Sequence, residues 1–192
     1  MRQISKHSSF KLPGSTKRTS KQLGFVLLET NSKKYFGGTH LKKSHAKTKR
    51  PITTKQPMHL VLRSSLAKRA LSFLLKDKQV YGIVASQAQK HGVKLYNFAN
   101  GGNHIHLLVM PSSRAAFVSF VRSISGLIAR LILGAERGNS KGLKFWDQRP
   151  YTDIVSWGRH FNRVKDYLNQ NILEAYGFIK FKPRSEKRFS TA

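Results

Sequence analysis

The chain has 192 residues and carries 36 Lys and Arg against 8 Asp and Glu, a formal net charge of +28. A surface with this imbalance repels itself unless it meets a polyanion, so we expect a nucleic-acid partner. A solvated basic surface, as in a ribosomal or nucleoid protein, fits the charge equally well. The sequence contains no Cys, which excludes disulfides, zinc-thiolate sites and cysteine nucleophiles.

Two basic segments flank the part of the chain that is expected to fold. Residues 1–56 contain 14 Lys and Arg and a single acid, Glu29, with few apolar residues. Such a segment cannot bury enough apolar surface to offset its ordering entropy. We therefore expect a flexible basic N-terminal arm over residues 1–56, a folded domain over 57–178 and a basic C-terminal tail over 179–192.

The apolar stretches are short. None approaches the ~20 residues that span a bilayer, and no signal-peptide core follows the basic N-terminus. The sequence therefore predicts a cytoplasmic, nucleoid-associated protein that makes no contact with membranes.

The folded segment begins with a strand, a helix and a hairpin. Residues 58–63 follow a Pro and read MHLVLR, which is a strand pattern. Residues 65–91 predict mostly helix, because apolar residues recur near helical spacing and a Gly follows at 92. Residues 93–99 and 104–110 predict two strands joined by a turn at 100–103, whose letters NGGN are typical of a hairpin.

The second half is mainly helical. Residues 114–134 predict a long helix, 136–144 a glycine-rich charged loop, 145–155 one or two short strands, and 156–175 a last helix. The order of strand, helix, hairpin, helix, strand and helix predicts an α+β fold, in which helices flank an antiparallel sheet. Ferredoxin-like sheets of this kind are the platform of many nucleic-acid-binding modules.

Two histidines alternate in the strand that follows the turn. His104 and His106 are separated by one residue, so both imidazoles project from the same face, while Ile105 faces the core behind them. Two nitrogen ligands at that spacing can hold one divalent metal ion. The alternative is a pair of polar strand residues whose hydrogen bonds are satisfied by their neighbours.

The last predicted helix carries a tyrosine beside its apolar stripe. Tyr167 has Gln170 three residues later and Asn171 four residues later, on the same side of the helix. An amphipathic packing role is the usual fate of a helical tyrosine. A metal-binding pair, a tyrosine with nearby amides and a very basic chain together suit phosphodiester cleavage by a phenolic nucleophile.

The same residues resemble the single-tyrosine transposases of the insertion-sequence 200/605 type, and most closely the REP-associated tyrosine transposases. Residues 103–109 (NHIHLLV) resemble the strand that carries the two metal-binding histidines of these HUH endonucleases. Residues 51–52 and 57–64 resemble their first strand, and residues 145–151 and 164–171 their later strand and tyrosine helix. The resemblance covers about residues 50–178.

The resemblance implies a chemistry and a set of residues. His104 and His106 would bind Mg²⁺ or Mn²⁺, and Tyr167 would attack DNA to form a 5′-phosphotyrosine intermediate. The family places a third, amide-bearing ligand one turn after the tyrosine, often Gln; here that position is Asn171, with Gln170 as the substitute. The implied partner is single-stranded or hairpin DNA with palindromic repeats. Monomer and homodimer both stay open, because in one arrangement of this family the tyrosine helix serves the partner's metal site and in others its own.

Other residues are alternatives for the same roles. Tyr151 and Tyr176 are alternative nucleophiles, but the first lies in a predicted strand and the second at a helix end. His59 lies in a strand and could lie near the site, although a core or sheet-face role is the simpler interpretation. His160 belongs to the start of the last helix.

A further set of residues could contact DNA directly. Trp146 and Trp157 could stack on bases, although core packing is the default for tryptophan. Arg122 and Arg130 lie eight residues apart on the long helix, where they would meet phosphate or solvent. Arg149 completes the predicted DNA-binding set.

The main rival function is a nucleic-acid-binding protein without catalysis, either a domesticated regulator or an RNA-associated module. Both histidines and Tyr167 are present, which argues against the first form. No RNP-type aromatic strand is evident, which argues against the second.

Overall fold

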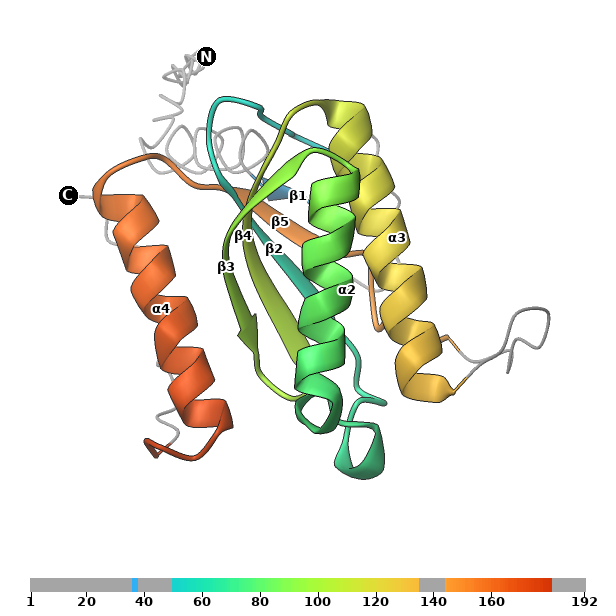
Figure 1. Ribbon diagram of the computed structural model, residues 1–192. Helices are drawn as coiled ribbons and strands as arrows, with labels where there is room; N and C mark the ends of the chain where they lie inside the picture. The colour runs from blue at the N-terminus through green and yellow to red at the C-terminus, as the bar shows by residue number, and fades with distance from the viewer. Residues whose placement is uncertain (1–35, 38–49, 135–143, 181–192) are drawn as a thin grey trace, which may run out of the picture.

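The computed structural model describes residues 36–37, 50–134 and 144–180 (Figure 1). Within these residues one antiparallel sheet has the strand order β1-β5-β2-β4-β3. Its strands are β1 (Phe36–Gly37), β2 (Met58–Arg63), β3 (Val93–Asn100), β4 (His104–Pro111) and β5 (Tyr151–Ile154). The predicted α+β class is therefore confirmed.

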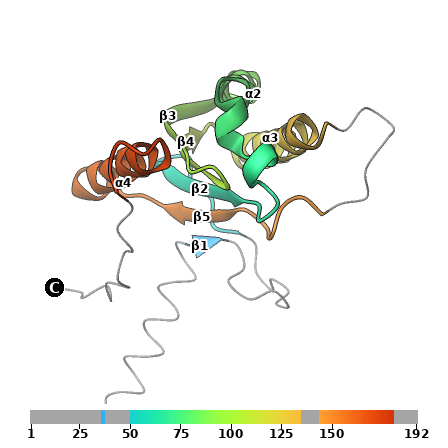
Figure 2. The same cartoon turned by 90° about the horizontal axis from the view of Figure 1, so that it is seen from below.

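Helices cover both faces of the sheet. Two short 3₁₀ turns, η1 (Arg69–Leu71) and η2 (Phe73–Lys76), lead into α2 (Asp77–Lys90). Helix α2 packs beside α3 (Arg114–Leu133) on one face, and α4 (Arg159–Ala175) lies on the other, against β3 (Figures 1 and 2). We call these the α2/α3 face and the α4 face.

The alternation of the two central strands divides their side chains between the faces. Strands β2 and β4 are paired in register, with Leu60 opposite Leu107 and Val61 opposite His106. Successive side chains of a strand point to opposite faces. Every second residue of both strands is apolar and packs in the main core with α2 and α3. The residues in between point to the face that α4 covers. This core includes Met58, Leu60, Leu62, Ile105, Leu107, Val109, Phe117, Phe120, Ile124 and Ile128.

The β3–β4 hairpin turn is fixed by backbone contacts with the segment after β2. The Ser64 amide donates to the Asn103 carbonyl at 2.9 Å, and the Phe73 amide donates to the Gly102 carbonyl at 2.9 Å. The Asn100 side chain accepts from the Gly102 amide at 3.0 Å and donates to Asp77 at 2.7 Å. The turn therefore holds the first residues of β4 in one place.

This arrangement explains why the first helix is shorter than predicted. The sequence predicts helix from residue 65, whereas α2 begins at Asp77. The amide of Phe73 is bonded to the hairpin turn, and Ser72 accepts from the Leu74 amide to cap η2. Residues 64–76 therefore serve as a tertiary brace, which helical periodicity cannot reveal.

The remaining boundaries agree within a few residues, with one addition. Residues 36–37, inside the predicted arm, pair with Thr152 and Asp153 as an edge strand. Within residues 145–155 the structure has one strand, β5. The predicted loop at 136–144 lies almost wholly outside the described residues, as does most of the predicted C-terminal tail.

Helix α3 corrects the statement that no apolar stretch reaches membrane-spanning length. By length and composition, Arg114–Leu133 is long and apolar enough to cross a membrane. Core helices pass the same test, and α3 buries five residues, Phe117, Phe120, Ile124, Ile128 and Ile132, in the main core.

Candidate active site

Three histidines share the α4 face of the sheet. His104 and His106 alternate along β4, and His59 lies on β2, opposite Leu108 in the register. His59 alternates with the buried residues Met58 and Leu60, so it points to the face opposite the main core. The fold therefore gathers His59 with the two histidines that the sequence singled out.

His106 and His59 are in direct contact. His59 Nε2 lies 2.9 Å from His106 Nδ1, and the two rings are nearly parallel, with centroids 5.1 Å apart. His106 is only 5% exposed. Burial, and secondarily the charge of nearby His160, lower the pKa of His59 to about 4, so His59 is neutral at neutral pH.

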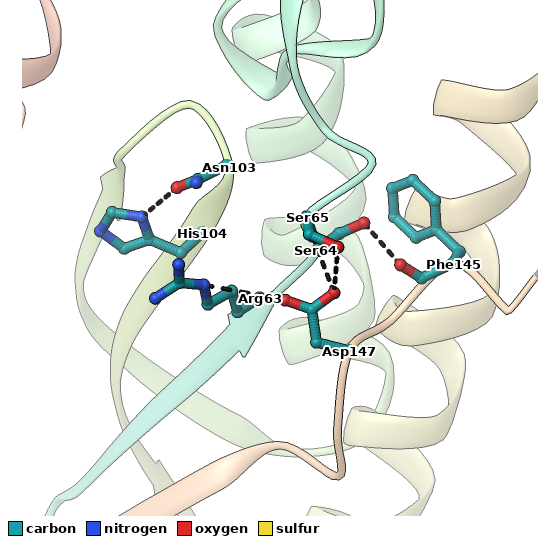
Figure 3. Close-up of polar contacts among 7 residues, drawn as sticks. All are labelled: Arg63, Ser64, Ser65, Asn103, His104, Phe145 and Asp147. Atoms are coloured by element: carbon teal, nitrogen blue, oxygen red, sulfur yellow. Dashed lines mark hydrogen bonds and ion pairs between the residues drawn. The ribbon is translucent and has the colours of Figure 1, made fainter. Parts of the chain in front are cut away.

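His104 is held by the turn that precedes it. Its Nδ1 lies 2.7 Å from the Asn103 side-chain oxygen (Figure 3). Its ring meets the His106 ring edge-on, with centroids 4.8 Å apart. A Cβ on Gly101 would overlap the His104 ring, far inside any normal contact. Position 101 therefore requires glycine, because the imidazole lies against the backbone there.

A polar cluster flanks the same end of β4. Arg63 is the register partner of His104, and its Nε lies 3.7 Å from an Asp147 carboxylate oxygen (Figure 3). Asp147 also accepts from the Ser65 amide and hydroxyl, each at 2.8 Å. A largely exposed guanidinium is thus tethered beside His104, where it could meet a phosphate group.

Helix α4 brings Tyr167 to the histidines. Leu168 is fully buried in a small second core on the α4 face, with Ala99, Leu108 and Val155, and Tyr167 packs against this core. The Tyr167 ring meets the His106 ring edge-on at 5.6 Å and the His59 ring edge-on at 6.2 Å. Two segments about 60 residues apart in the sequence therefore meet at one point.

The two amides after Tyr167 differ in their surroundings. Asn171 is 7% exposed and, with Leu168, is one of the two buried residues of α4, so it faces the sheet. Gln170 is half-buried and donates to the Glu174 carboxylate at 2.7 Å. Asn171 is thus the amide on the histidine side of the helix.

The alternative nucleophiles have less suitable surroundings. Burial, followed by the Asp153 carboxylate, raises the pKa of Tyr151, which disfavours its phenolate form. Tyr176 is about half exposed at the end of α4, and burial together with Asp77 raises its pKa. Burial also raises the pKa of Asp153 to about 6.

His160 lies in the first turn of α4 and is not one of the three clustered histidines. Its Nδ1 accepts from the Ser156 amide at 3.3 Å, and burial followed by Arg163 lowers its pKa. Its charge is the second cause of the low pKa of His59, which places it near the cluster.

The structure separates most of the predicted DNA-binding residues from Tyr167. Arg122 and Arg130 are exposed on α3, in the layer on the other side of the sheet. Trp146 packs against the main core, and its indole donates to the Ser125 carbonyl at 2.9 Å. Arg149 is exposed and lies near Arg50, whose pKa is lowered first by burial and then by Arg149 and Arg114.

Trp157 lies at the other end of the α4 layer. It is about half exposed, packs against Tyr96 and Phe161, and donates from its indole to the Lys55 carbonyl at 3.1 Å. Its ring joins α4 to β3 and to the segment before β2.

Sequence reasoning left the position of His59 open between the site and the core or sheet face. The sequence does show which face of its strand His59 occupies, because it lies between the apolar Met58 and Leu60. His106 lies between apolar residues of its own strand in the same way. The strand register was not visible, and only the pairing of β2 with β4 places His59 diagonally beside His106.

The donor set suits a divalent cation that is shared with a phosphate. Among the described residues, no three His, Cys, Asp or Glu side chains form a metal-binding group. A set of two imidazoles and one amide oxygen is neutral and leaves coordination positions for water or phosphate oxygens. His104 and His106 on β4, with Asn171 on the buried side of α4, supply such a set.

Comparisons with known proteins bear on the family and the fold of the chain. Residues 52–171 match the family "Transposase IS200 like". No curated protein sequence matches the chain. Among solved structures, the chain resembles a REP-associated tyrosine transposase bound to a REP hairpin, with a TM-score of 0.55 and 13% identity over 71% of this chain and 77% of that one.

A candidate transposase from Deinococcus radiodurans is also similar, with a TM-score of 0.41 and 15% identity over 66% of this chain and 98% of that one. At these identities the first likeness shows the fold alone, whereas the family match spans more than half of the 192 residues. The chain therefore belongs to the family of IS200-like transposases, which are DNA-cleaving enzymes.

Proposed function

We propose that this protein cuts and rejoins single-stranded or hairpin DNA by direct attack of Tyr167 on a backbone phosphate. The observation that carries the proposal is the edge-on contact of Tyr167 with His106, which joins a phenol on α4 to an imidazole pair on β4. A phenol and imidazoles on one sheet face are the parts that phosphodiester transfer requires.

The transfer is balanced within the DNA and the protein. A bond forms between the Tyr167 oxygen and phosphorus, and the bond between phosphorus and the 3′-oxygen breaks. The phenolic proton is lost and the 3′-oxygen leaves as a hydroxyl, so a 5′-phosphotyrosine and a free 3′-OH result. Attack by another 3′-OH reverses these changes and rejoins the strand without a nucleotide cofactor.

The residues present fit a divalent ion, and Mg²⁺ or Mn²⁺ is the expected cofactor. His104, His106 and Asn171 would hold it, with Gln170 less suitable because its side chain is held along the helix at Glu174 and is not among the buried residues of α4. Such an ion would polarise the scissile phosphate and stabilise its developing charge. The protein itself fixes the imidazoles through Asn103 and His59, and fixes Tyr167 by packing its helix on the sheet.

The substrate class follows from charge and from the structural likeness. The net charge of +28 favours the phosphate backbone without selecting a base sequence. The similar structure is described as bound to a REP hairpin, and we propose a palindromic hairpin as the substrate here. Tethered Arg63, beside His104, would contact a backbone phosphate close to the reacting one.

Replacement of Tyr167 by Phe tests the assignment. The change removes one hydroxyl and keeps the ring that contacts His106 and His59. We expect no covalent protein–DNA product, measured as a labelled band in denaturing gels with Mn²⁺ and hairpin oligonucleotides taken from the flanks of the gene. Binding of the same hairpin should stay within about twofold, because the phosphate contacts remain.

Tyr151→Phe and Tyr176→Phe are the matched controls, and both should form the product. Undiminished product from Tyr167→Phe would transfer the role to one of those residues. Hairpin binding by the unaltered protein, without any covalent product, would instead support the binding protein without catalysis.

A further inference from the structure

His59 is a half-buried polar group that the proposed chemistry does not use directly. Its Nε2 lies 2.9 Å from His106 Nδ1, and its ring also meets Tyr167 edge-on. His59 therefore contacts both a proposed metal ligand and the proposed nucleophile. A histidine whose sole role was to fill the sheet face would not need a ring nitrogen at hydrogen-bond distance from another imidazole.

The hydrogen bond between two neutral imidazoles contains a single proton, so one ring donates and the other accepts. If His106 donates from Nδ1, its Nε2 carries a lone pair that can bind a cation. If His59 donates from Nε2, His106 must carry its own proton on Nε2 and cannot bind a cation there. The partner of Nδ1 thus decides which tautomer His106 adopts.

We propose that His59 is a positioning residue: it accepts the Nδ1 proton of His106, fixes the ring with Nε2 as the coordinating nitrogen, and supports the Tyr167 ring from the side. The inference rests on the proposed function for its purpose, but the tautomer itself is a property of the metal-free protein. Asn103 has the equivalent position at the other histidine, because its side-chain oxygen lies 2.7 Å from His104 Nδ1.

The sharpest test reads the tautomer directly. Two-bond ¹⁵N–¹H correlation spectra of metal-free, ¹⁵N-labelled protein distinguish Nδ1-protonated from Nε2-protonated histidine. The His106 signal is assigned by its absence from a His106→Gln variant. We expect the Nδ1-protonated form in the unaltered protein, and an Nε2-protonated His106 there would overturn the proposal whatever the variants do.

Two substitutions at His59 separate hydrogen bonding from packing. His59→Phe keeps a ring of similar shape and removes the acceptor, whereas His59→Gln supplies an amide oxygen in its place. We expect His59→Phe to lose the pure Nδ1 tautomer and to weaken Mn²⁺ binding by about 10- to 100-fold, measured by calorimetry. His59→Gln should restore the tautomer and bind Mn²⁺ within about threefold of the unaltered protein, as a rescue by retained hydrogen bonding.

His91 provides the matched control, because it is also hydrogen-bonded, with Nε2 3.0 Å from the Ser123 hydroxyl, but it lies between α2 and α3. His91→Phe should leave the His106 tautomer and Mn²⁺ binding unchanged. Equal Mn²⁺ affinity of His59→Phe and the unaltered protein would overturn the proposal, even if covalent product forms normally. A tautomer change in a protein that forms no covalent product would support the positioning role and reject the proposed function.

Discussion

The two faces of the central sheet have opposite characters, although the same strands build both. On the α2/α3 face, β2 and β4 present the side chains of Leu60, Leu62, Ile105 and Leu107, each at most 1% exposed. On the α4 face the intervening positions carry three histidines and Arg63. Among the residues that the structure describes, the buried apolar cluster on this face has four members, Ala99, Leu108, Val155 and Leu168.

The difference shows how a small domain can combine a stable core with a polar site. Because side chains alternate along a strand, an apolar face and a reactive face can share one backbone without sharing a side chain. The α2/α3 face supplies most of the buried apolar area, and hence most of the hydrophobic free energy. The α4 face can then hold imidazoles, a phenol and an amide at some loss of apolar burial.

The largest expected effect tests the stabilising face. Phe120 on α3 is fully buried in the main core. Phe120→Ala should lower the free energy of unfolding by about 3–5 kcal/mol, through lost burial and the cavity left behind. Urea unfolding measures the loss. Covalent product per folded molecule should be unchanged, and a proportional loss of chemistry would show that the two faces are coupled.

The next effect tests the reactive face. His106→Ala removes an imidazole that is 5% exposed and touches His59, His104 and Tyr167. We expect covalent product to fall by about 100-fold or more, because loss of even an outer-shell partner of a metal ligand reduces activity by ~10–100-fold. His91→Ala is the control. Full cleavage by the unaltered protein in excess EDTA would contradict a metal role for the pair.

Two titrating groups on the α4 face should give opposite dependences of stability on pH. The pKa of His59 falls from 6.5 to about 4 on folding, so the unfolded chain binds the proton more tightly and stability decreases as pH falls from 6.5 towards 4. The pKa of Asp153 rises from 3.8 to about 6, so its contribution increases as pH falls from 6 towards 3.8. The two contributions therefore oppose each other in the unaltered protein.

Single substitutions separate them. Asp153→Asn leaves the His59 contribution and should be less stable at pH 4.5 than at pH 7, by up to about 3 kcal/mol, because each tenfold change in proton affinity corresponds to ~1.4 kcal/mol. His59→Gln leaves only the Asp153 contribution of the two. That contribution should make the free energy of unfolding of this variant larger at pH 4.5 than at pH 7. Urea unfolding at both pH values, with the double variant as control, measures the difference. Parallel curves for the two single variants would contradict the opposite directions of the two pKa changes.

The smallest effect asks which face the DNA meets. Arg63 lies beside His104, and Arg163 is exposed on α4, whereas Arg122 and Arg130 are exposed on α3. Each lost contact with single-stranded phosphate should flatten the plot of log affinity against log salt by about 0.7. Arg63→Gln with Arg163→Gln should therefore flatten it by up to about 1.4, and Arg122→Gln with Arg130→Gln should leave it unchanged. The reverse result would place the DNA on α3.

Sequence reasoning located the strands and the long helices because their signals are local. Strands β2 and β4 are predicted within one residue, and α3 ends where Gly134 adopts the left-handed conformation with φ 62°. Residues 65–76 were predicted as mostly helix but form only two short 3₁₀ turns, because amides of the brace donate to Gly102 and Asn103, about 30 to 40 residues away. Such contacts leave no periodic trace in the chain.

In the candidate site, too, some residues could be identified from local sequence signals and others only from the packing of distant segments. His104, His106 and Tyr167 were found from strand parity and helix position, together with a family resemblance. The choice between Asn171 and Gln170, and the place of His59, depend on how α4 and β2 approach β4, which is set by packing. The two-residue strand β1 has too short a pattern for any periodicity to be visible.

The glycine shortly before the histidine strand has a consequence for how freely the sequence can vary. A saturation-mutagenesis library should show position 101 closed even to alanine, because any Cβ overlaps the His104 ring, and selection for DNA cleavage should remove every substitution there. Gly82 in α2 and Gly126 in α3 have nothing within 4 Å of the place a Cβ would occupy. Alanine at each of those two helical positions should raise the free energy of unfolding by about 0.5–1 kcal/mol. Alanine variants should therefore be enriched when the library is selected for folding. The contrast with these two helical glycines would therefore show that position 101 is restricted by the His104 ring.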